Sequence, residues 1–241
     1  MKNIPILILH GWNLSAAKFK PLQDELVRRG FQVLCPDLPG FGKEKKPDKP
    51  FFLSDYVSFV ERKLNSKRIE KVILVGHSFG GRIGIKLAVQ NPKLLHALIL
   101  TGTPGINPVP GPKILFFLFL AKTGNAIFSL PVLSVFKDKL RHLLYKIARA
   151  TDFYNTDKKM RETFKNIVRE NLSSYLKKIT IPTLFLWGKE DMIVPLRIAQ
   201  AMSELMVDAK LVVIPEARHG LPWTHPKIFV AEMEKFLEKI E

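Results

Sequence analysis

Cysteine is nearly absent from this sequence of 241 residues, which contains only Cys35. A single cysteine excludes any disulfide within the chain, so the fold must be stabilised by its hydrophobic core. Cys35 ends the apolar run at 31–35, which is typical of a buried strand, and we therefore expect an inert thiol. Nothing in the cysteine content requires an oxidising compartment.

Long apolar runs are also lacking. The most apolar stretch away from the N-terminus covers residues 114–121, whereas a membrane-spanning helix needs about twenty apolar residues. Residues 1–10 contain one lysine and a short apolar run, and they lead into His-Gly-Trp rather than a small-residue cleavage site. This pattern predicts a strand and not a signal peptide. We expect a soluble, cytoplasmic protein with no stable membrane insertion.

Acidic residues are few relative to basic ones, 22 against 38, which gives a net charge of +16. Residues 1–103 and 104–178 each carry +9, whereas residues 179–241 carry −2. Arginine-rich runs with interleaved aromatic residues are missing, so we expect no nucleic-acid partner. The positive field suits anionic substrates, acidic carrier proteins or anionic lipid surfaces, and it is equally compatible with a general solubility trait.

The sequence does contain a regular alternation of short apolar runs and helical patterns. The apolar runs are rich in Val, Ile and Leu on both faces, and they lie at 4–9, 31–35, 71–76, 97–101, 183–187 and 210–214. The helical segments have a period near 3.6, and they lie at 19–29, 55–64 (after a Ser54 cap), 80–90, 196–205 and 226–240. This alternation predicts an α/β fold, doubly wound, with a mainly parallel sheet of about six strands.

The alternation breaks once, between Thr103 and Ile179. A turn-rich stretch at 103–112 leads into apolar and basic helical segments, and the strand pattern resumes at 181–187. Structureless loops of this length are uncommon in compact domains. We therefore expect a helical cap inserted at 104–178 into a core made of residues 1–103 and 179–241.

The most specific motif is Gly76-His77-Ser78-Phe79-Gly80, which joins an apolar strand directly to a helix. This context is typical of a nucleophile elbow, where flanking glycines are needed because side chains would collide with the strand and the helix. The tight turn raises the serine hydroxyl above the sheet, and the amide of the following residue points at the reacting oxygen. Ser78 is therefore the candidate nucleophile.

A serine nucleophile needs a base that a third group holds in place. In folds with such an elbow, the acid and then the histidine follow the serine along the chain. The loop at 187–195 follows a strand, at the edge of the sheet where ligands bind. Glu190 and Asp191 both qualify, but only one of two neighbouring side chains can face the site. We choose Asp191 as the orienting acid and assign Glu190 to the solvated surface.

The loop at 216–223 follows the last predicted strand, so it can bring His219 over the elbow. We therefore choose His219 as the general base. The other histidines fit less well, because one adjoins the serine, one starts the final helix and two lie outside the expected loops (His77, His225, His96 and His142).

The first strand ends in His10-Gly11-Trp12. Gly11 allows a sharp turn there, and the backbone N–H of Trp12 can join that of Phe79 in an oxyanion hole. Losing one such donor typically costs about 10²–10³ in rate. We expect His10 to brace this loop rather than to act as an acid or base.

Taken together, these segments resemble the α/β-hydrolase superfamily, and within it the small carboxylesterase-like members with a helical cap. The oxyanion loop, the elbow and the loops of Asp191 and His219 occur in the family's order, and residues 36–42 look like its Asp-x-x-Gly-x-Gly turn. The resemblance covers most of the chain. It implies a serine hydrolase, and more specifically a carboxylesterase, with no metal and no cofactor.

The sequence departs from the family pattern in two places. The antiparallel strands that usually precede the oxyanion strand are missing or trimmed, because that strand already starts at Ile4. Residues 43–46 are Lys-Glu-Lys-Lys where relatives often carry a serine. Neither change removes a catalytic group. Haloalkane dehalogenases and epoxide hydrolases of the superfamily use an aspartate at the elbow, whereas Ser78 favours acyl transfer to water.

The apolar part of the cap suggests a substrate class. Phe116, Phe119 and Phe128 are candidates for lining an acyl pocket, although they can equally well pack the cap onto the core. We expect a small-molecule ester with an uncharged or medium-chain acyl group. The basic cap would favour an anionic leaving group or a carrier-bound substrate.

Three other functions stay open at this point. A carbon–carbon bond hydrolase of the meta-cleavage type uses the same triad, and its keto-acid substrates carry a carboxylate that a basic pocket would suit. A perhydrolase or acyltransferase would differ only in the second nucleophile. A ligand sensor would keep the scaffold without turnover. The sequence does not indicate the oligomeric state.

Overall fold

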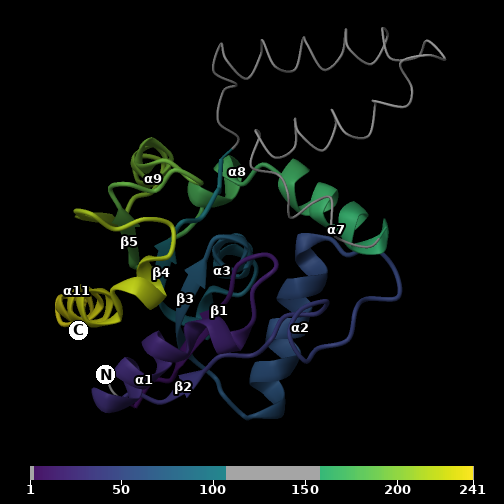
Figure 1. The fold of residues 1–241 in the computed structure, drawn as a ribbon, viewed down its shortest axis with the longest axis horizontal. Coiled ribbons are helices and arrows are strands. Elements are labelled where there is room, and N and C mark those ends of the chain that lie inside the picture. Colours follow the sequence, from purple (N-terminus) through teal and green to yellow (C-terminus); the bar gives the residue numbers. More distant parts are fainter. Residues whose placement is uncertain (1–2, 107–157, 241) are drawn as a thin grey trace, which may run out of the picture.

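The computed structural model describes residues 3–106 and 158–240, which form a six-stranded sheet with helices on both faces (Figure 1). The strand order is β2-β1-β3-β4-β5-β6, and all neighbouring pairs are parallel. The strands are β1 (Ile6–Leu9), β2 (Val33–Leu34), β3 (Val72–His77), β4 (Leu95–Thr101), β5 (Thr183–Gly188) and β6 (Ala209–Ile214).

The helices connect these strands in the order expected for a doubly wound fold. They are α1 (Lys20–Arg28), α2 (Leu53–Ser66), α3 (Phe79–Gln90), α7 (Lys158–Arg169), α8 (Ser173–Leu176), α9 (Leu196–Ser203), α10 (Leu221–Thr224) and α11 (Pro226–Leu237). Two short 3-10 turns, Ala16–Phe19 and Pro92–Leu94, precede α1 and β4.

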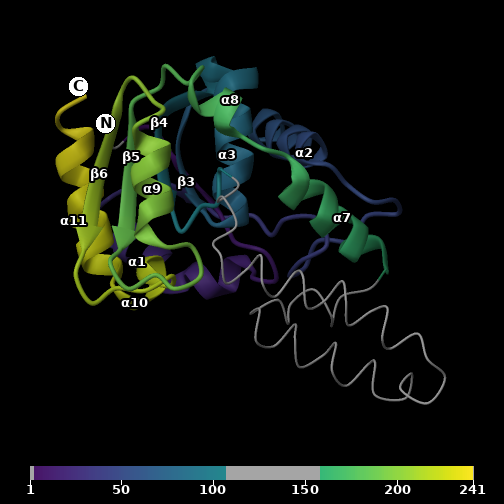
Figure 2. The same ribbon diagram turned by 90° about the horizontal axis from the view of Figure 1, so that it is seen from above.

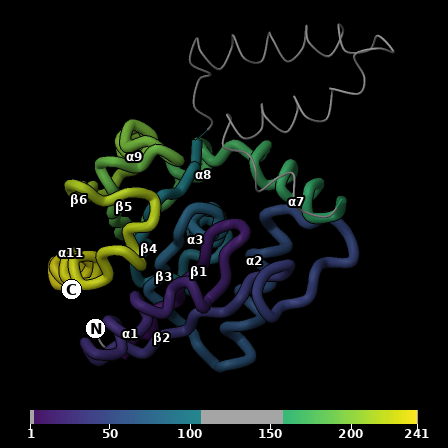
Figure 3. The backbone as a smooth tube through the Cα atoms, viewed as in Figure 1, coloured from purple at the N-terminus to yellow at the C-terminus, as the bar shows by residue number. Residues whose placement is uncertain are grey.

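Each face of the sheet has its own hydrophobic core. Ile6 and Ile8 of β1 pack on the side of α1 and α11, whereas Leu7 and Leu9 pack on the side of α2, α3 and α9. All four side chains are buried, because parallel strands are covered on both faces. Figure 2 shows the same two helical layers from above, and Figure 3 traces the backbone through them in the view of Figure 1. The predicted doubly wound fold is confirmed.

The strand and helix ends differ from the predicted ones in small ways. The run at 31–35 forms only the two-residue strand β2, because the Phe31 N–H closes the end of α1 by donating to Leu26. Helix α2 begins at Leu53, and the Asp55 carboxylate accepts from the Phe52 N–H at 2.7 Å. The predicted Ser54 cap is therefore wrong, because an acid at the third helical position caps this helix.

Cys35 is half-buried, and burial raises the pKa of its thiol to about 12. The thiol therefore stays protonated near neutral pH, as expected of an inert cysteine. None of the helices in the described part of the chain is long and apolar enough to cross a membrane.

The described part of the insertion between β4 and β5 contains two helices, α7 and α8. Most of the predicted cap, and with it Phe116, Phe119 and Phe128, lies outside the described residues. The proposed boundaries at 104 and 178 therefore stay predictions.

Arg82 of α3 connects both ends of this insertion to the core. Its buried guanidinium donates to the carbonyls of Pro104, where the insertion begins, and of Ile167 (2.7 Å) and Glu170, where it ends. Burial lowers the pKa of Arg82 to about 10, so it remains charged near neutral pH. Lys86, one turn further along α3, forms an ion pair with the Glu170 carboxylate at 2.7 Å.

Candidate active site

Ser78 lies at the turn between β3 and α3, with φ 52° and ψ −112°. A positive φ is costly for a residue with a side chain, and such strained positions gather at functional sites. The Ser78 N–H donates to the Thr101 carbonyl at the end of β4, at 2.9 Å. This bond holds the elbow at the carboxyl edge of the sheet.

The glycines around the serine are required by close backbone contacts. A Cβ on Gly76 would lie 2.5 Å from the Cα of Gly81, where β3 and α3 meet. A Cβ on Gly80 would lie 2.0 Å from the carbonyl oxygen of Leu9 on β1. Both separations are shorter than any real Cβ contact, so these positions accept only glycine. The structure thus supplies the physical reason for the predicted glycine pattern.

Asp191 and His219 come from the loops after β5 and β6, and they meet directly. The His219 Nδ1 lies 2.8 Å from the Asp191 Oδ2, and the Asp191 side chain is almost fully buried. The other carboxylate oxygen, Oδ1, accepts from the N–H groups of Ile193 (2.9 Å) and Val194 (2.8 Å). Because an ionised carboxylate only accepts, the His219 Nδ1 carries the proton and Nε2 is left as the acceptor.

Ser78 and His219 both contact the end of strand β4. Thr101 binds the Ser78 amide, and Gly102 follows it with φ 56°. A Cβ on Gly102 would lie 2.7 Å from the His219 Cε1, so the imidazole packs directly on this glycine. Among the described residues, the Ser78 hydroxyl makes no hydrogen bond. Catalytic contacts of this kind often tighten only when substrate is bound.

His77 contacts His219, and no pattern in the sequence indicates this contact. Its Nε2 lies 3.0 Å from the His219 carbonyl oxygen, and the two rings meet edge to face with centroids 4.7 Å apart. Since a carbonyl only accepts, the His77 Nε2 carries the proton. Burial, and then the neighbouring His219, lower the pKa of His77 well below its usual range. His77 is therefore neutral.

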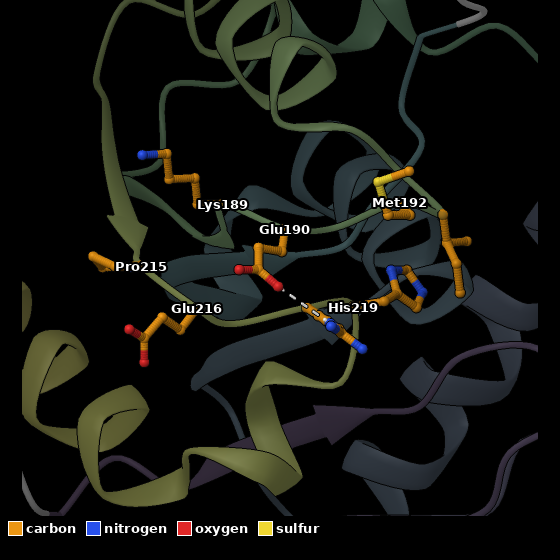
Figure 4. A pocket seen from close by; sticks show the side chains of 8 residues that line it. Lys189, Glu190, Met192, Pro215, Glu216 and His219 are labelled. Carbon is orange, nitrogen blue, oxygen red and sulfur yellow. Dashed lines mark hydrogen bonds and ion pairs between the residues drawn. The ribbon is translucent and has the colours of Figure 1, made fainter.

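The competing acid, Glu190, takes a different environment. Its side chain is exposed, and its carboxylate pairs with Arg218 at 3.2 Å (Figure 4). His225 starts α11, as expected, with its Nδ1 2.8 Å from the Thr224 hydroxyl. His142 lies outside the described residues.

Trp12 and Phe79, the candidate oxyanion-hole residues, lie side by side. Their rings pack edge to face at 5.5 Å. Among the described residues, neither backbone N–H has a hydrogen-bond acceptor. Two donors without acceptors next to the elbow are what an oxyanion hole needs.

His10 braces the loop that carries Trp12. Its Nδ1 lies 2.8 Å from the Gly11 carbonyl, and its Nε2 lies 2.9 Å from the Leu38 N–H. Nδ1 therefore donates and Nε2 accepts, which makes the ring neutral. Burial lowers the pKa of His10, in agreement with that assignment. Nearby, the Asp37 carboxylate accepts from the Ala16 and Lys43 N–H groups at 2.7 and 2.8 Å.

A cavity of about 920 Å³ opens beside His219 (Figure 4). Its lining mixes charged and apolar side chains from the loops after β5 and β6, namely Lys189, Glu190, Met192, Ile193, Pro215, Glu216 and Arg218. Met192 is 68% exposed and Ile193 is 63% exposed.

From α7, the Phe164 ring packs on Trp12 at 5.1 Å, which places an apolar side chain of the insertion next to the candidate oxyanion loop.

The described residues contain no cluster of three or more side chains suited to a metal ion. The Asp191–His219 contact and the serine at the elbow are suited to proton transfer at the imidazole and nucleophilic attack by the hydroxyl.

Comparisons with known proteins agree with this fold. A family model described as "alpha/beta hydrolase fold" matches residues 4–226. A 2-hydroxy-6-oxononadienedioate/2-hydroxy-6-oxononatrienedioate hydrolase of Cupriavidus pinatubonensis is 26% identical over 257 residues, which cover 96% of this chain and 86% of the relative.

Two solved structures illustrate the shared fold. An esterase from Exiguobacterium antarcticum superposes with a TM-score of 0.74 at 22% identity, over 98% of this chain and 92% of the other. A meta-cleavage product hydrolase from Pseudomonas fluorescens IP01 has a TM-score of 0.71 at 21% identity, over 99% and 92% of the two chains. At these identities the likeness concerns the fold alone.

Proposed function

We propose that this chain, which belongs to the alpha/beta hydrolase family, cleaves carboxylic esters through an acyl-enzyme on Ser78. The observation that carries this proposal is the 2.8 Å contact between the His219 Nδ1 and the Asp191 Oδ2 beside a strained serine. That contact assigns the proton to Nδ1, so that the His219 Nε2 can serve as the base for Ser78 in this proposal.

The reaction follows from these roles. His219 removes the hydroxyl proton of Ser78 as its oxygen attacks the ester carbonyl, and the resulting imidazolium is stabilised by the Asp191 carboxylate. The backbone N–H groups of Trp12 and Phe79 bind the negative oxygen of the tetrahedral intermediate. The imidazolium then protonates the leaving alcohol. Water repeats the sequence on the acyl-enzyme, releasing the carboxylic acid and restoring Ser78.

The start of α3 assists the same step. Phe79 is its first residue, so the partial positive charge of the helix N-terminus lies beside the developing oxyanion. The surrounding side chains include Phe164 and Trp12, which favour an apolar acyl or alkyl group. We assign the insertion at 104–178, including Phe116, Phe119 and Phe128, to the selection of that group.

A second candidate is hydrolysis of a carbon–carbon bond in a 2-hydroxy-6-oxo-dienoate. Relatives that carry such names are 24–28% identical to this chain over 93% or more of its length. Their named substrates contain a carboxylate, and Lys189 and Arg218 line the cavity beside His219. The same base and nucleophile would serve both reactions.

One panel of substrates separates the two candidates. Purified protein is assayed with p-nitrophenyl esters from acetate to dodecanoate and, in parallel, with 2-hydroxy-6-oxo-6-phenylhexa-2,4-dienoate, whose absorbance is lost on cleavage. Ester turnover that disappears in Ser78→Ala supports the esterase proposal. Turnover of the dienoate at a kcat/KM at least tenfold above that of every ester would replace it with the second candidate. Failure of both substrate classes, together with no labelling of Ser78 by a fluorophosphonate, would refute both.

A further inference from the structure

Exposed cationic side chains gather on one part of the surface next to the candidate site, where two segments far apart in sequence meet. We propose that this surface, the basic ridge, binds the protein to the surface of an anionic lipid bilayer. Its members are Lys43, Lys45, Lys46 and Lys49 before α2, and Lys158, Lys159 and Arg161 in the first turn of α7.

Several contacts join the two segments of the basic ridge. The Phe51 N–H donates to the Thr163 hydroxyl at 2.9 Å, and the Asn166 side chain donates to the Phe51 carbonyl at 3.3 Å. A Cβ on Gly40 would lie 2.5 Å from the end of the Met160 side chain, so that turn packs tightly on α7. Figures 1 and 2 show the chain before α2 beside the N-terminal end of α7.

The acidic residues among these cations are bound to other lysines. The Glu44 carboxylate pairs with Lys63 at 2.9 Å, and the Glu162 carboxylate pairs with Lys165 at 2.7 Å. Asp48 is the remaining acid within residues 43–49 and is exposed. Even without Lys46, the six other cations of the basic ridge keep a large positive excess, which attracts an extended negative surface.

An exposed aromatic side chain accompanies the charges. Phe52 is 56% exposed, and it directly follows Phe51, which is tied to α7. An aromatic ring beside lysines is the combination by which peripheral proteins enter the headgroup region of a membrane.

The composition of the basic ridge favours a bilayer over the other polyanions. Six of its seven cations are lysines, which act as point charges, whereas sites that recognise individual phosphates favour the fork of arginine. Single-stranded nucleic acids need rows of stacking aromatic rings, and Phe52 is the one exposed large aromatic side chain among the described residues. A fluid layer of anionic headgroups needs neither feature.

The basic ridge also lies close to the candidate oxyanion loop. Phe41, just before the ridge, packs on Trp12 with ring centroids 4.8 Å apart, and Phe164 of α7 packs on Trp12 at 5.1 Å. A protein held by the ridge would therefore bring its candidate site to the lipid surface. Binding itself does not depend on the proposed esterase, so each can fail without the other.

The test is sedimentation with vesicles of phosphatidylcholine alone or with 30% phosphatidylglycerol, using the full chain carrying Ser78→Ala so that no turnover interferes. We expect binding that requires phosphatidylglycerol and is lost in high salt. Each lysine near an anionic surface contributes about fivefold in affinity. The variant Lys43→Glu/Lys45→Glu/Lys49→Glu should therefore lose about 10²-fold or more in vesicle affinity.

A matched control reverses three charges elsewhere. Lys67, Arg68 and Lys71 are exposed at the opposite end of α2, so their change to glutamate should alter vesicle affinity by less than about threefold. Phe52→Ser, which leaves the charge unchanged, should weaken binding measurably. The proposal is overturned if vesicle binding does not require phosphatidylglycerol, if the control variant loses as much as the ridge variant, or if duplex DNA binds more tightly than the vesicles at equal salt.

Discussion

The sharpest test of the proposed triad is the change Asp191→Asn. In the wild-type chain, the Asp191 Oδ1 accepts from the Ile193 and Val194 N–H groups, and Oδ2 accepts from His219. The asparagine keeps the shape of the aspartate but has only one accepting oxygen. The two backbone donors will hold that oxygen, because turning the amide would leave both of them facing an NH₂ group at a cost of about 1–3 kcal/mol each.

The asparagine NH₂ then faces the His219 Nδ1, which must give up its proton and accept instead. The proton moves to Nε2, the nitrogen that has to receive the Ser78 proton in the proposed mechanism. His219 can no longer act as a base. The loss of kcat expected from a wrong tautomer is about 10⁴-fold, or about 5.5 kcal/mol of transition-state stabilisation.

The assay is kcat for the best p-nitrophenyl ester, with thermal unfolding as the folding control. Since the Asp191→Asn variant preserves both backbone hydrogen bonds, its Tm should change by only a few degrees. Glu190→Gln is the matched variant, because Glu190 is the exposed neighbour that binds Arg218. Its kcat should stay within about twofold of wild type. The reasoning is refuted if Asp191→Asn retains a tenth or more of the wild-type kcat. It is also refuted if Glu190→Gln lowers kcat by more than about twofold.

Three further predictions rest on single contacts. Gly102→Ala should lower kcat by about 10²-fold while the protein still folds, because its Cβ displaces the His219 ring; unchanged kcat would contradict this. Arg82→Met should lower the free energy of unfolding in urea by about 2–4 kcal/mol, since buried carbonyls lose their donor; a change below about 0.5 kcal/mol would contradict it. Burial lowers the folded-state pKa of His10 and of His77, so the unfolded chain binds more protons below pH 6.5. The free energy of unfolding should thus fall as pH drops from 7 to 5, by up to about 1.4 kcal/mol per pH unit for each histidine. An unchanged midpoint of urea unfolding over this pH range would contradict the prediction.

The sheet could be predicted because its signal is local. Runs such as 72–77 and 183–188 are apolar on both faces, and each lies between helical patterns, so the alternation determines a parallel, doubly wound sheet. The order of the elbow, the acid and the histidine then places three loops at one edge. That edge is where the structure brings Asp191 and His219 together.

The sequence does not indicate the contacts between residues that lie far apart in the chain. Arg82 looks like an ordinary polar residue on a helix, but it binds carbonyls more than eighty positions away. His77 adjoins the serine in sequence, but its contact with the His219 backbone spans 142 positions. Phe164 belongs to an amphipathic pattern, and only the fold shows that it packs on Trp12. No local pattern distinguishes these residues from their neighbours.

The strand order explains why the proposed chemistry lies where it does. From β1 the chain moves outward to β2, and it then returns to the other side of β1 to form β3. The loops after β1 and β3 therefore leave in opposite directions, and a crevice at the carboxyl ends of the strands results. Trp12 follows β1 and Ser78 follows β3, so both candidate N–H donors and the candidate nucleophile lie at this crevice because of the topology alone. Selection of the substrate must then come from side chains outside the loops that follow the strands. Among the described elements, α7 is positioned for this selection, because its Phe164 packs on Trp12.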